Sequence, residues 1–447
     1  MPKQTRPSPK WIALAVVALG AAACLPQGFR LPQSSLLSSF ERQSGRIAYI
    51  GSDGNVQIID QGARHAVALT SDALGIPDAA GRTVYYDYPT WSPIDRRVAF
   101  RRVMSVQGGS LTSSILVASE DGGDPIEVYR SGTDAPIYLY WSPDGERIGF
   151  LTGGLAGRPL ALRVARADGE ETAVIDSGRP YYWAWSPADS SIFAHVGGTA
   201  SSDPAQARLS LLGLNESITE IGMDLEPGLF QAPSYSPDGQ SLLFATHLDS
   251  GVGELMLTNA SGEGRTVVAE FPGAVAFAWA PRGHKVAYIA SGAAGERLPG
   301  DLFFLDLEDP EHPVQIKTEA EEVVAFFWAP DGERVAYLVP VVITVPGTEA
   351  PAQVSIDEIL LALYVAESSD GTTKFLGNFR PSQATLGILP FFDQYQRSAT
   401  IWSPDGNYLV ISALYGADAE VLFLVPSSGN IEPRYLVDGG QAFWSWK

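Results

Sequence analysis

The residues of this sequence that could bind a metal ion are its five histidines and its acidic glycine turns. The histidines are His65, His195, His247, His284 and His312. Zinc sites in proteins bring three or four ligands together, often at short spacings, whereas each of these histidines lies in a different part of the chain without a second ligand at such a spacing. The segments Asp53-Gly54-Asn55 and Asp121-Gly122-Gly123-Asp124 resemble calcium loops, but both lack the alternating oxygen ligands and the closing Glu. We therefore predict no metal site and no cofactor, and interpret these residues as parts of strands and turns.

Motifs for covalent catalysis and for phosphate binding are absent from the sequence as well. A hydrolase with an α/β domain would carry a Gly-x-Ser-x-Gly nucleophile elbow, and no such pentapeptide occurs. The glycine pairs Gly153-Gly154 and Gly197-Gly198 lack the Gly-Lys-Ser/Thr ending of a phosphate-binding loop. We assign no catalytic residue and favour a protein that is not an enzyme.

A short motif, Trp141-Ser142-Pro143-Asp144-Gly145, recurs along the chain. Pro presets φ at the second position of a type I turn, Asp suits the third position and Gly accepts the exit, so the motif predicts a tight turn between two strands. The repeated aromatic residues are Trp91, Trp141, Trp185, Tyr235, Trp279, Trp328 and Trp402. The Asp could be taken for a catalytic acid. Because Ile94, Ala188 and Arg282 replace it in sister copies, we interpret it as a turn former.

The spacing of this motif predicts the fold. Successive copies lie 44 to 50 residues apart, except for a final interval of 74 residues. A period of roughly 40 to 50 residues with four short strands per unit is typical of a β-propeller, in which each repeat forms one blade. Apolar residues alternate with a period of two in segments such as 115–122 and 361–365, which favours strands over helices. The sequence therefore predicts an all-β protein.

The two ends of the chain are predicted to share one blade. Residues 46–69 resemble the second, third and fourth strands of a blade that has no first strand. Residues 441–446 resemble the segment before the turn in 181–185, so the last strand would complete the first blade, with Trp446 as its repeat residue. Such a closure leaves no exposed sheet edge at the seam. Seven whole blades and one shared blade predict eight.

The repeat units, with following strands such as Arg147-Ile148-Gly149-Phe150 and Arg334-Val335-Ala336-Tyr337, resemble those of the TolB-like propeller family, also called PD40 or WD40-like repeats. The resemblance covers about residues 45–447 and implies a propeller fold. Members of that repeat family include periplasmic and surface interaction proteins and the propeller domains of prolyl oligopeptidase-like peptidases. The chain departs from both, since it lacks room for the α/β domain that precedes the propeller in TolB and has no hydrolase domain.

The first 24 residues have the pattern of a targeting signal. Lys3, Arg6 and Lys10 precede an apolar run over residues 11–23. A helix over that run would be only about 20 Å long, short of a bilayer core of roughly 30 Å, so cleavage is favoured over a permanent span.

Cys24 directly follows this run and is the only cysteine of the chain. The segment 19–24 resembles the lipobox of bacterial lipoproteins. We predict that residues 1–24 are a signal peptide, that Cys24 is lipidated, that residues 25–44 are a tether and that residues 45–447 are one propeller domain. An ordinary cleaved signal or a short membrane anchor is the alternative. A single cysteine excludes an internal disulfide, so stability must come from packing and ring closure.

Composition narrows the classes of partner. The formal net charge of −21 repels nucleic acid and anionic lipid head groups, so residence at a membrane would depend on acyl chains rather than on the protein surface. With 45% apolar and 10% aromatic residues the chain has ample material for a core. We expect an extracytoplasmic, membrane-anchored monomer that does not bind nucleic acid.

Loop lengths predict which face of the propeller contacts other molecules. The turns between the first and second strands and between the third and fourth strands of each blade are short and share one face, which we call the turn face. The variable connections, including residues 340–356 and 378–398, collect on the opposite, long-loop face, and binding residues on rigid scaffolds commonly lie in such loops. Aromatic residues and arginines are favoured at binding hot spots. The candidate binding residues on the long-loop face are Tyr85, Tyr86, Tyr138, Arg179, Tyr181, Tyr182, Phe391, Tyr395 and Arg397.

The function predicted from the sequence is a non-enzymatic scaffold at the cell envelope that contacts a protein partner through the long-loop face. A propeller that binds a small molecule or a glycan at the channel mouth is the alternative, and a lyase or hydrolase with a metal held in the channel is a third class. An aromatic-lined pocket would favour the glycan, clustered carboxylates or histidines the enzyme, and a flat apolar patch the scaffold.

Overall fold

Five four-stranded antiparallel sheets follow one another along the chain, as the repeat predicts. In each of them every strand pairs with its neighbour in sequence. In chain order their strands are β4 (Arg82–Trp91), β5 (Arg97–Val106), β6 (Leu111–Ser119), β7 (Ile126–Ser131); β8 (Pro136–Trp141), β9 (Arg147–Gly153), β10 (Leu160–Arg166), β11 (Thr172–Gly178); β12 (Tyr181–Trp185), β13 (Ser191–Val196), β14 (Arg208–Leu214), β15 (Ile218–Met223); β16 (Ser234–Tyr235), β17 (Ser241–His247), β18 (Gly253–Asn259), β19 (Thr266–Phe271); and β20 (Val275–Trp279), β21 (Lys285–Ala290), β22 (Asp301–Asp306), β23 (Val314–Lys317).

A sixth sheet joins the two ends of the chain. Its ten strands, in order across the sheet, are β24 (Ala325–Trp328), β25 (Arg334–Val341), β26 (Leu360–Glu367), β27 (Thr373–Pro381), β28 (Tyr408–Tyr415), β29 (Ala419–Pro426), β30 (Arg434–Trp444), β1 (Ile47–Gly51), β2 (Val56–Ile59) and β3 (Val67–Ala68). The first half of β30 pairs with β29 and its second half pairs with β1, so the last strand completes the first blade as predicted. The count of eight blades stays a prediction, because hydrogen bonding continues without a break from β24 to β3.

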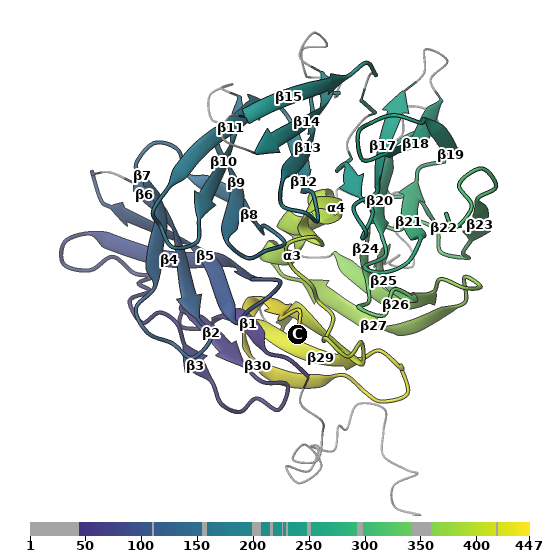
Figure 1. Ribbon diagram of the computed structural model, residues 1–447. Helices are drawn as coiled ribbons and strands as arrows, with labels where there is room; N and C mark the ends of the chain where they lie inside the picture. The colour runs from purple at the N-terminus through teal and green to yellow at the C-terminus, as the bar shows by residue number, and fades with distance from the viewer. Residues whose placement is uncertain are drawn as a thin grey trace, which may run out of the picture. The chain divides into compact units, whose positions relative to one another are not determined.

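The computed structural model describes residues 44–109, 111–153, 159–198, 207–214, 218–225, 227–228, 231–247, 252–292, 298–341, 359–416 and 419–447. The predicted signal peptide, Cys24, nearly all of the predicted tether and most of the long loop at 340–356 lie outside these residues. In Figure 1 the sheets follow one another around a circle, with β1 beside β30 and with α3 and α4 near the centre. Among the described residues, no helix is long and apolar enough to cross a membrane.

The repeated motif forms the tight turn predicted from its residue types. In the second complete sheet, the Ser142 hydroxyl donates to the Asp144 carboxylate (2.5 Å) and accepts the N–H of Arg147 (2.9 Å). The same carboxylate accepts the N–H of Glu146 (2.9 Å), and Gly145 adopts a left-handed φ of 70°. The equivalent Ser and Asp make these bonds in two further turns, at 236–238 and 403–405. The Asp is thus a turn former.

Five indoles of the repeat tie their blade to the one before it. They donate to the backbone carbonyl of the residue that precedes the neighbouring repeat aromatic, at 2.9 to 3.2 Å; they are Trp91, Trp141, Trp185, Trp328 and Trp402. The carbonyl that Trp91 reaches belongs to Phe443, and Ile47 pairs with Trp444 as Ile192 pairs with Trp185. The repeat residue of the shared blade is therefore Trp444, and the sequence-based assignment to Trp446 is wrong by two residues.

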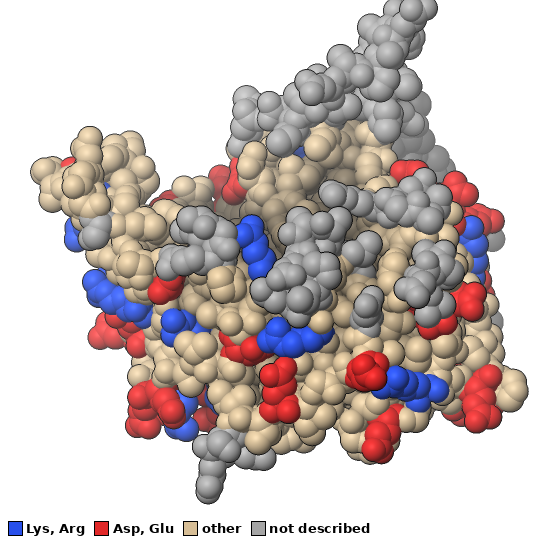
Figure 2. Space-filling view, turned by 90° about the horizontal axis from the view of Figure 1, so that it is seen from above, with Lys and Arg blue, Asp and Glu red and all other residues tan. Residues whose placement is uncertain are grey.

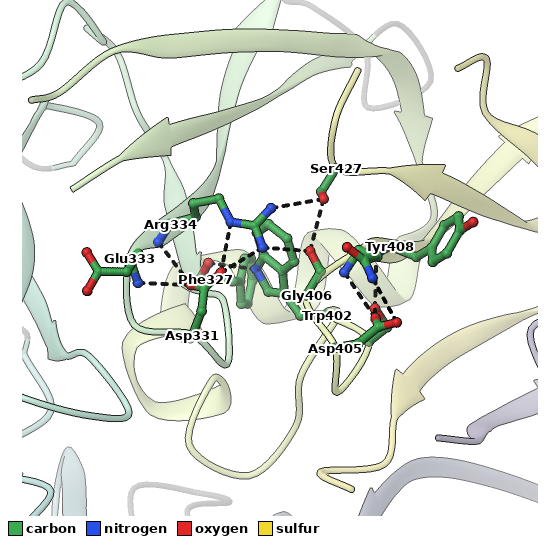
Figure 3. A network of polar contacts seen from close by, with 11 residues as sticks. Phe327, Asp331, Glu333, Arg334, Trp402, Asp405, Gly406, Tyr408 and Ser427 are labelled. Atoms are coloured by element: carbon green, nitrogen blue, oxygen red, sulfur yellow. Dashed lines mark hydrogen bonds and ion pairs between the residues drawn. The ribbon is translucent and has the colours of Figure 1, made fainter. Parts of the chain in front are cut away.

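A repeated arginine reinforces the same junctions (Figure 3). Arg334 of β25 donates to the carbonyl of Gly406 (2.9 Å) and to the hydroxyl of Ser427 (3.1 Å), and its guanidinium lies over the Trp402 ring at 5.4 Å. Arg97 makes the equivalent contacts with Trp141 and Gly145, and Arg147 makes them with Trp185 and Asp189. One face of each of these indoles is therefore covered by a cation from the preceding blade.

Apolar packing between neighbouring sheets supplies the core. Most of the largest fully buried side chains, including Trp91, Trp183 and Phe277, come from the first two strands of successive blades. Acidic and basic side chains are instead interspersed over the surface seen in Figure 2.

Candidate functional site: a closed funnel on the turn face

A helical segment on the long-loop side lies at the centre of the ring. Between β27 and Thr400 the chain forms α3 (Gln383–Ile388), η5 (Leu389–Phe391) and α4 (Phe392–Tyr395). Ser382 caps α3, its hydroxyl accepting the N–H of Thr385 at 3.2 Å. We call residues 382–398 the central plug. The sequence predicted a variable loop here, and the structure shows instead an ordered element that contacts the inner strands of several blades.

Gln394 fastens the plug to two neighbouring blades. Its side-chain amide accepts the N–H of Trp183 (3.2 Å) and donates to the carbonyl of the same residue (2.9 Å), so it pairs with the inner edge of β12 as a strand would. It also donates to the Tyr138 hydroxyl (3.0 Å), which donates in turn to the Gln394 backbone carbonyl (2.7 Å). Burial raises the pKa of the Tyr138 phenol, so this hydroxyl stays protonated.

Asp393 and Arg397 hold the blade that contains β16. The buried Asp393 carboxylate accepts the N–H of Ala232 at 2.7 Å, and Arg397 donates to the carbonyls of Ala232 and Pro233. Burial raises the pKa of Asp393, and the nearby Arg397 guanidinium opposes that shift. Because the backbone at 232–233 bonds to the plug, the inner strand β16 has only two residues.

Tyr395 completes the plug against a group of strained residues. It stacks on Tyr88 with ring centroids 6.0 Å apart and meets Tyr138 edge-on at 5.0 Å. Tyr88, Tyr138 and Gln441 each lie three residues before a repeat Trp, and all three have left-handed φ values of 47° to 52°. Non-glycine residues adopt this conformation at a cost, and such positions concentrate at functional sites. The plug therefore rests on the irregular inner strands of three adjoining blades.

A cavity of about 500 Å³ opens on the turn face, and the end of the plug together with residues 399–400 forms its floor. Its rim is formed by prolines of the repeated turns, namely Pro143, Pro187, Pro237, Pro281, Pro330 and Pro404. Its wall contains the aromatic residues Tyr140, Trp185, Tyr235, Trp279, Phe327, Trp328, Trp402 and Trp446. Gln396, Arg397, Ala399 and Thr400 close the inner end. We call this cavity the turn-face funnel.

The charges that line the funnel are opposite in sign to the net charge of the protein. Among its described lining residues the charged side chains are Arg282 and Arg397, with no Asp, Glu or His. The described part of the chain also contains no cluster of three or more His, Cys, Asp or Glu that could hold a metal ion. The funnel thus offers cationic and apolar groups, and its side chains include none of the usual acid–base catalysts.

Two N–H donors in the funnel wall lack an acceptor. Nε1 of Trp279 and Nε2 of Gln396 are both buried and make no hydrogen bond with the described residues. In five sister blades the equivalent indole reaches the carbonyl before the neighbouring repeat aromatic, which for Trp279 would be that of Ser234. We attribute the missing bond to the hold of the plug on the residues just before Ser234. Buried donors without partners cost about 1–3 kcal/mol each.

A second cavity, of about 380 Å³, lies at the junction of β30 and β4, but its charges are largely neutralised. Arg96 pairs with Glu120 at 2.7 Å, and Arg97, at the edge of the same junction, pairs with Asp95 at 2.7 Å. We therefore consider the turn-face funnel the stronger candidate.

The predicted binding residues of the long-loop face fall into three groups. Tyr85, Arg179 and Phe391 are exposed. Tyr395 and Arg397 are half-buried parts of the plug, and Arg397 reaches through to the funnel on the other face. The remaining four tyrosines are buried and contact other residues of the protein. Tyr86 donates a hydrogen bond to Asp72, Tyr181 donates to Asp176 at 2.9 Å, and Tyr138 bonds to Gln394. Tyr182 packs against His195. The structure does not bring the nine residues together into one surface.

Comparison with known proteins concerns the fold. No protein-family model and no curated protein matches the sequence. Among solved structures, TolB from Acinetobacter baumannii is 14% identical, with 89% of this chain and 81% of that chain covered and a TM-score of 0.39. The β-propeller domain of the Trilobed protease from Pyrococcus furiosus is 11% identical, covering 80% and 98%, with a TM-score of 0.45. An oligogalacturonate lyase from Vibrio parahaemolyticus is 12% identical, covering 88% and 86%, with a TM-score of 0.42. At these identities and TM-scores the likeness assigns no function, and the succession of four-stranded sheets itself makes the chain a β-propeller protein.

Proposed function

We propose that this protein is a non-enzymatic, lipid-anchored propeller of the extracytoplasmic envelope that binds a protein partner through the turn-face funnel. The lipid anchor would be Cys24, and the propeller would act as a monomeric scaffold. The proposal keeps the scaffold function predicted from the sequence and moves its contact surface to the opposite face.

The composition of the funnel carries this proposal. Its volume of about 500 Å³ lies within the usual range of ligand pockets, and its aromatic and arginine lining is typical of binding hot spots. Its described side chains supply no carboxylate or imidazole for acid–base chemistry or for metal binding. These features favour recognition over catalysis.

The exposure of the aromatic rings favours a protein partner over a glycan. A sugar ring would need an accessible indole face, but Trp402 is fully buried and Trp185 nearly so, with an arginine over one face of each, and Trp279 and Trp446 are only partly exposed. The rim instead presents a ring of proline side chains, against which apolar groups of a polypeptide can pack.

A photo-crosslinking experiment in cells tests the proposal. A photoreactive amino acid replaces Pro237 at the funnel rim, Tyr85 on the long-loop face, or Val314 on the outer strand β23, all of which are exposed. We expect a defined protein to crosslink from position 237 and from neither of the others. Crosslinking of a partner from position 85 alone would show that the partner contacts the long-loop face and would contradict the proposal.

A further inference from the structure

We infer that the turn-face funnel captures the carboxyl-terminal end of a polypeptide. The inference rests on the proposed function, because it names the part of the partner that the funnel would hold. Three features of the funnel support it: the cavity is closed at its inner end, its lining charges are positive, and its wall contains hydrogen-bond donors without acceptors.

The closed inner end favours a chain terminus over an internal segment. The floor consists of Gln396, Arg397, Ala399 and Thr400, and behind it the plug residues Phe392 and Gln394 are buried against the inner strands. A polypeptide that enters such a cavity must either reverse direction within it or end there. A cavity of about 500 Å³ that is rimmed by prolines holds a single extended end of a few residues more readily than a hairpin.

The charges of the lining favour a carboxyl terminus over an amino terminus. Arg282 is exposed on the rim and Arg397 lies at the floor, so the positive charge spans the depth of the funnel. The two bonds that Arg397 makes to backbone carbonyls occupy N–H groups without neutralising its charge. Asp393 faces Arg397 from the plug side, where burial raises the pKa of the carboxyl group, and Asp393 does not line the funnel.

The donors without acceptors supply the hydrogen bonds that a carboxylate needs. Nε1 of Trp279 and Nε2 of Gln396 come from different elements, yet both belong to side chains that line the funnel. Both nitrogen atoms are inaccessible to solvent in this structure. A ligand can therefore accept hydrogen bonds from them only if it packs tightly into the funnel wall. A carboxylate accepts several N–H bonds at once, and hydrogen bonds to a charged group are stronger than neutral ones. Backbone and side-chain N–H groups capture chain ends in other recognition modes in the same way.

The test uses the full chain in detergent and a degenerate library of N-acetylated hexapeptides, prepared both as free acids and as carboxyl-terminal amides. Affinity selection followed by mass spectrometry identifies bound peptides, and titration of the best binders gives dissociation constants. We expect free acids to bind at least about 10-fold more tightly than their amides, as expected for one hydrogen bond to a charged acceptor. We also expect the binding to weaken as salt is added, because salt screens the attraction between the carboxylate and the arginines.

Two matched variants locate the site. Trp279→Phe removes the unpaired indole N–H but keeps an aromatic ring, and we expect it to reduce the preference for acids over amides about 10-fold. Trp328→Phe removes an indole from the same wall whose N–H already donates to Ala278 at 3.0 Å, and it should leave that preference unchanged. Because the preference is a ratio measured on each variant, a change in overall stability does not imitate the effect.

The outcomes separate this inference from the proposed function. Equal binding of acids and amides, or no peptide binding while position 237 still crosslinks a partner, would overturn the chain-end inference and leave the scaffold function in place. Acid-selective peptides that bind Trp279→Phe as selectively as the wild type would also overturn it. Absence of crosslinking from position 237 would overturn the proposed function itself.

Discussion

Substitution of Gln394 tests whether the central plug is a fixed part of the propeller. The side chain makes three hydrogen bonds of 2.9 to 3.2 Å with Trp183 and Tyr138, and it is 4% exposed. Gln394→Ala leaves the inward N–H and C=O of Trp183 without partners, because β12 is the edge strand of its sheet. Each unsatisfied buried group costs about 1–3 kcal/mol, so we expect a loss of about 2–4 kcal/mol in the free energy of unfolding.

Urea denaturation followed by tryptophan fluorescence measures this loss. Gln240→Ala is the matched control, because Gln240 is an exposed turn residue whose amide makes only a bond of 3.4 Å to Asp238, and its loss should stay within about 0.5 kcal/mol. Gln394→Glu keeps the size of the side chain but puts an acceptor beside the Trp183 carbonyl, so it should cost at least as much as Ala. A loss below about 1 kcal/mol for Gln394→Ala would refute the view that the plug is held by these bonds.

Three further predictions concern the blade junctions, a buried histidine and the membrane anchor. Arg334→Ala removes the hydrogen bonds to Gly406 and Ser427, the ion pair with Asp331 (2.6 Å) and the cation–π contact with Trp402, and should lower the free energy of unfolding by about 2–3 kcal/mol. Arg82→Ala, which breaks an ion pair of a 54% exposed side chain, should change it by less than about 1 kcal/mol. Equal losses in urea denaturation would contradict this prediction. Burial lowers the pKa of His195 from 6.5 to about 4. Between pH 6.5 and pH 4, therefore, the imidazole is protonated in the unfolded chain but neutral in the folded chain, and the folded state loses stability as the pH falls. Over this range the wild type should lose about 3 kcal/mol of stability relative to His195→Asn. Parallel pH profiles of the two proteins would refute that assignment. Cys24→Ala should release the protein from membranes in cell fractionation, and retention of the variant would exclude acylation at Cys24 as the anchor.

The propeller fold could be predicted because its determinants are local and repeated. The Ser-Pro-Asp-Gly turn requires only contacts within about five residues, as the bonds among Ser142, Asp144 and Arg147 show. The closure by the last strand followed from a missing first strand at one end and an extra one at the other. The register of this last strand could not be predicted from the sequence. Trp444 and Trp446 lie on either side of Ser445, and the Ser-Pro-Asp-Gly residues that mark the repeat Trp in other copies do not follow either of them. Only the pairing of Ile47 with Trp444 decides between them.

The central plug could not be predicted, because its determinants are distant in sequence. Its helices have six and four residues, too few to show a helical period, and the main local signal is the N-cap at Ser382. What orders the plug is bonding to residues 211 and 256 positions away, at Trp183 and Tyr138. For the same reason Tyr138 was predicted as a surface contact, whereas the plug covers it. Sequence shows the aromatic residue but not the element that packs on it.

The candidate site lies where the chain departs from its own repeat. Arg282 occupies a position that holds Asp in most sister turns, and it gives the funnel rim a positive charge. Tyr235 replaces the repeat Trp in the blade whose inner strand the plug shortens, and the next indole, Trp279, is left without an acceptor. The plug itself falls within the one interval of 74 residues that breaks the regular spacing. A repeated blade specifies a scaffold and no ligand. We therefore expect the specificity of the protein to be encoded in these departures, which converge on one cavity from three separate places in the chain.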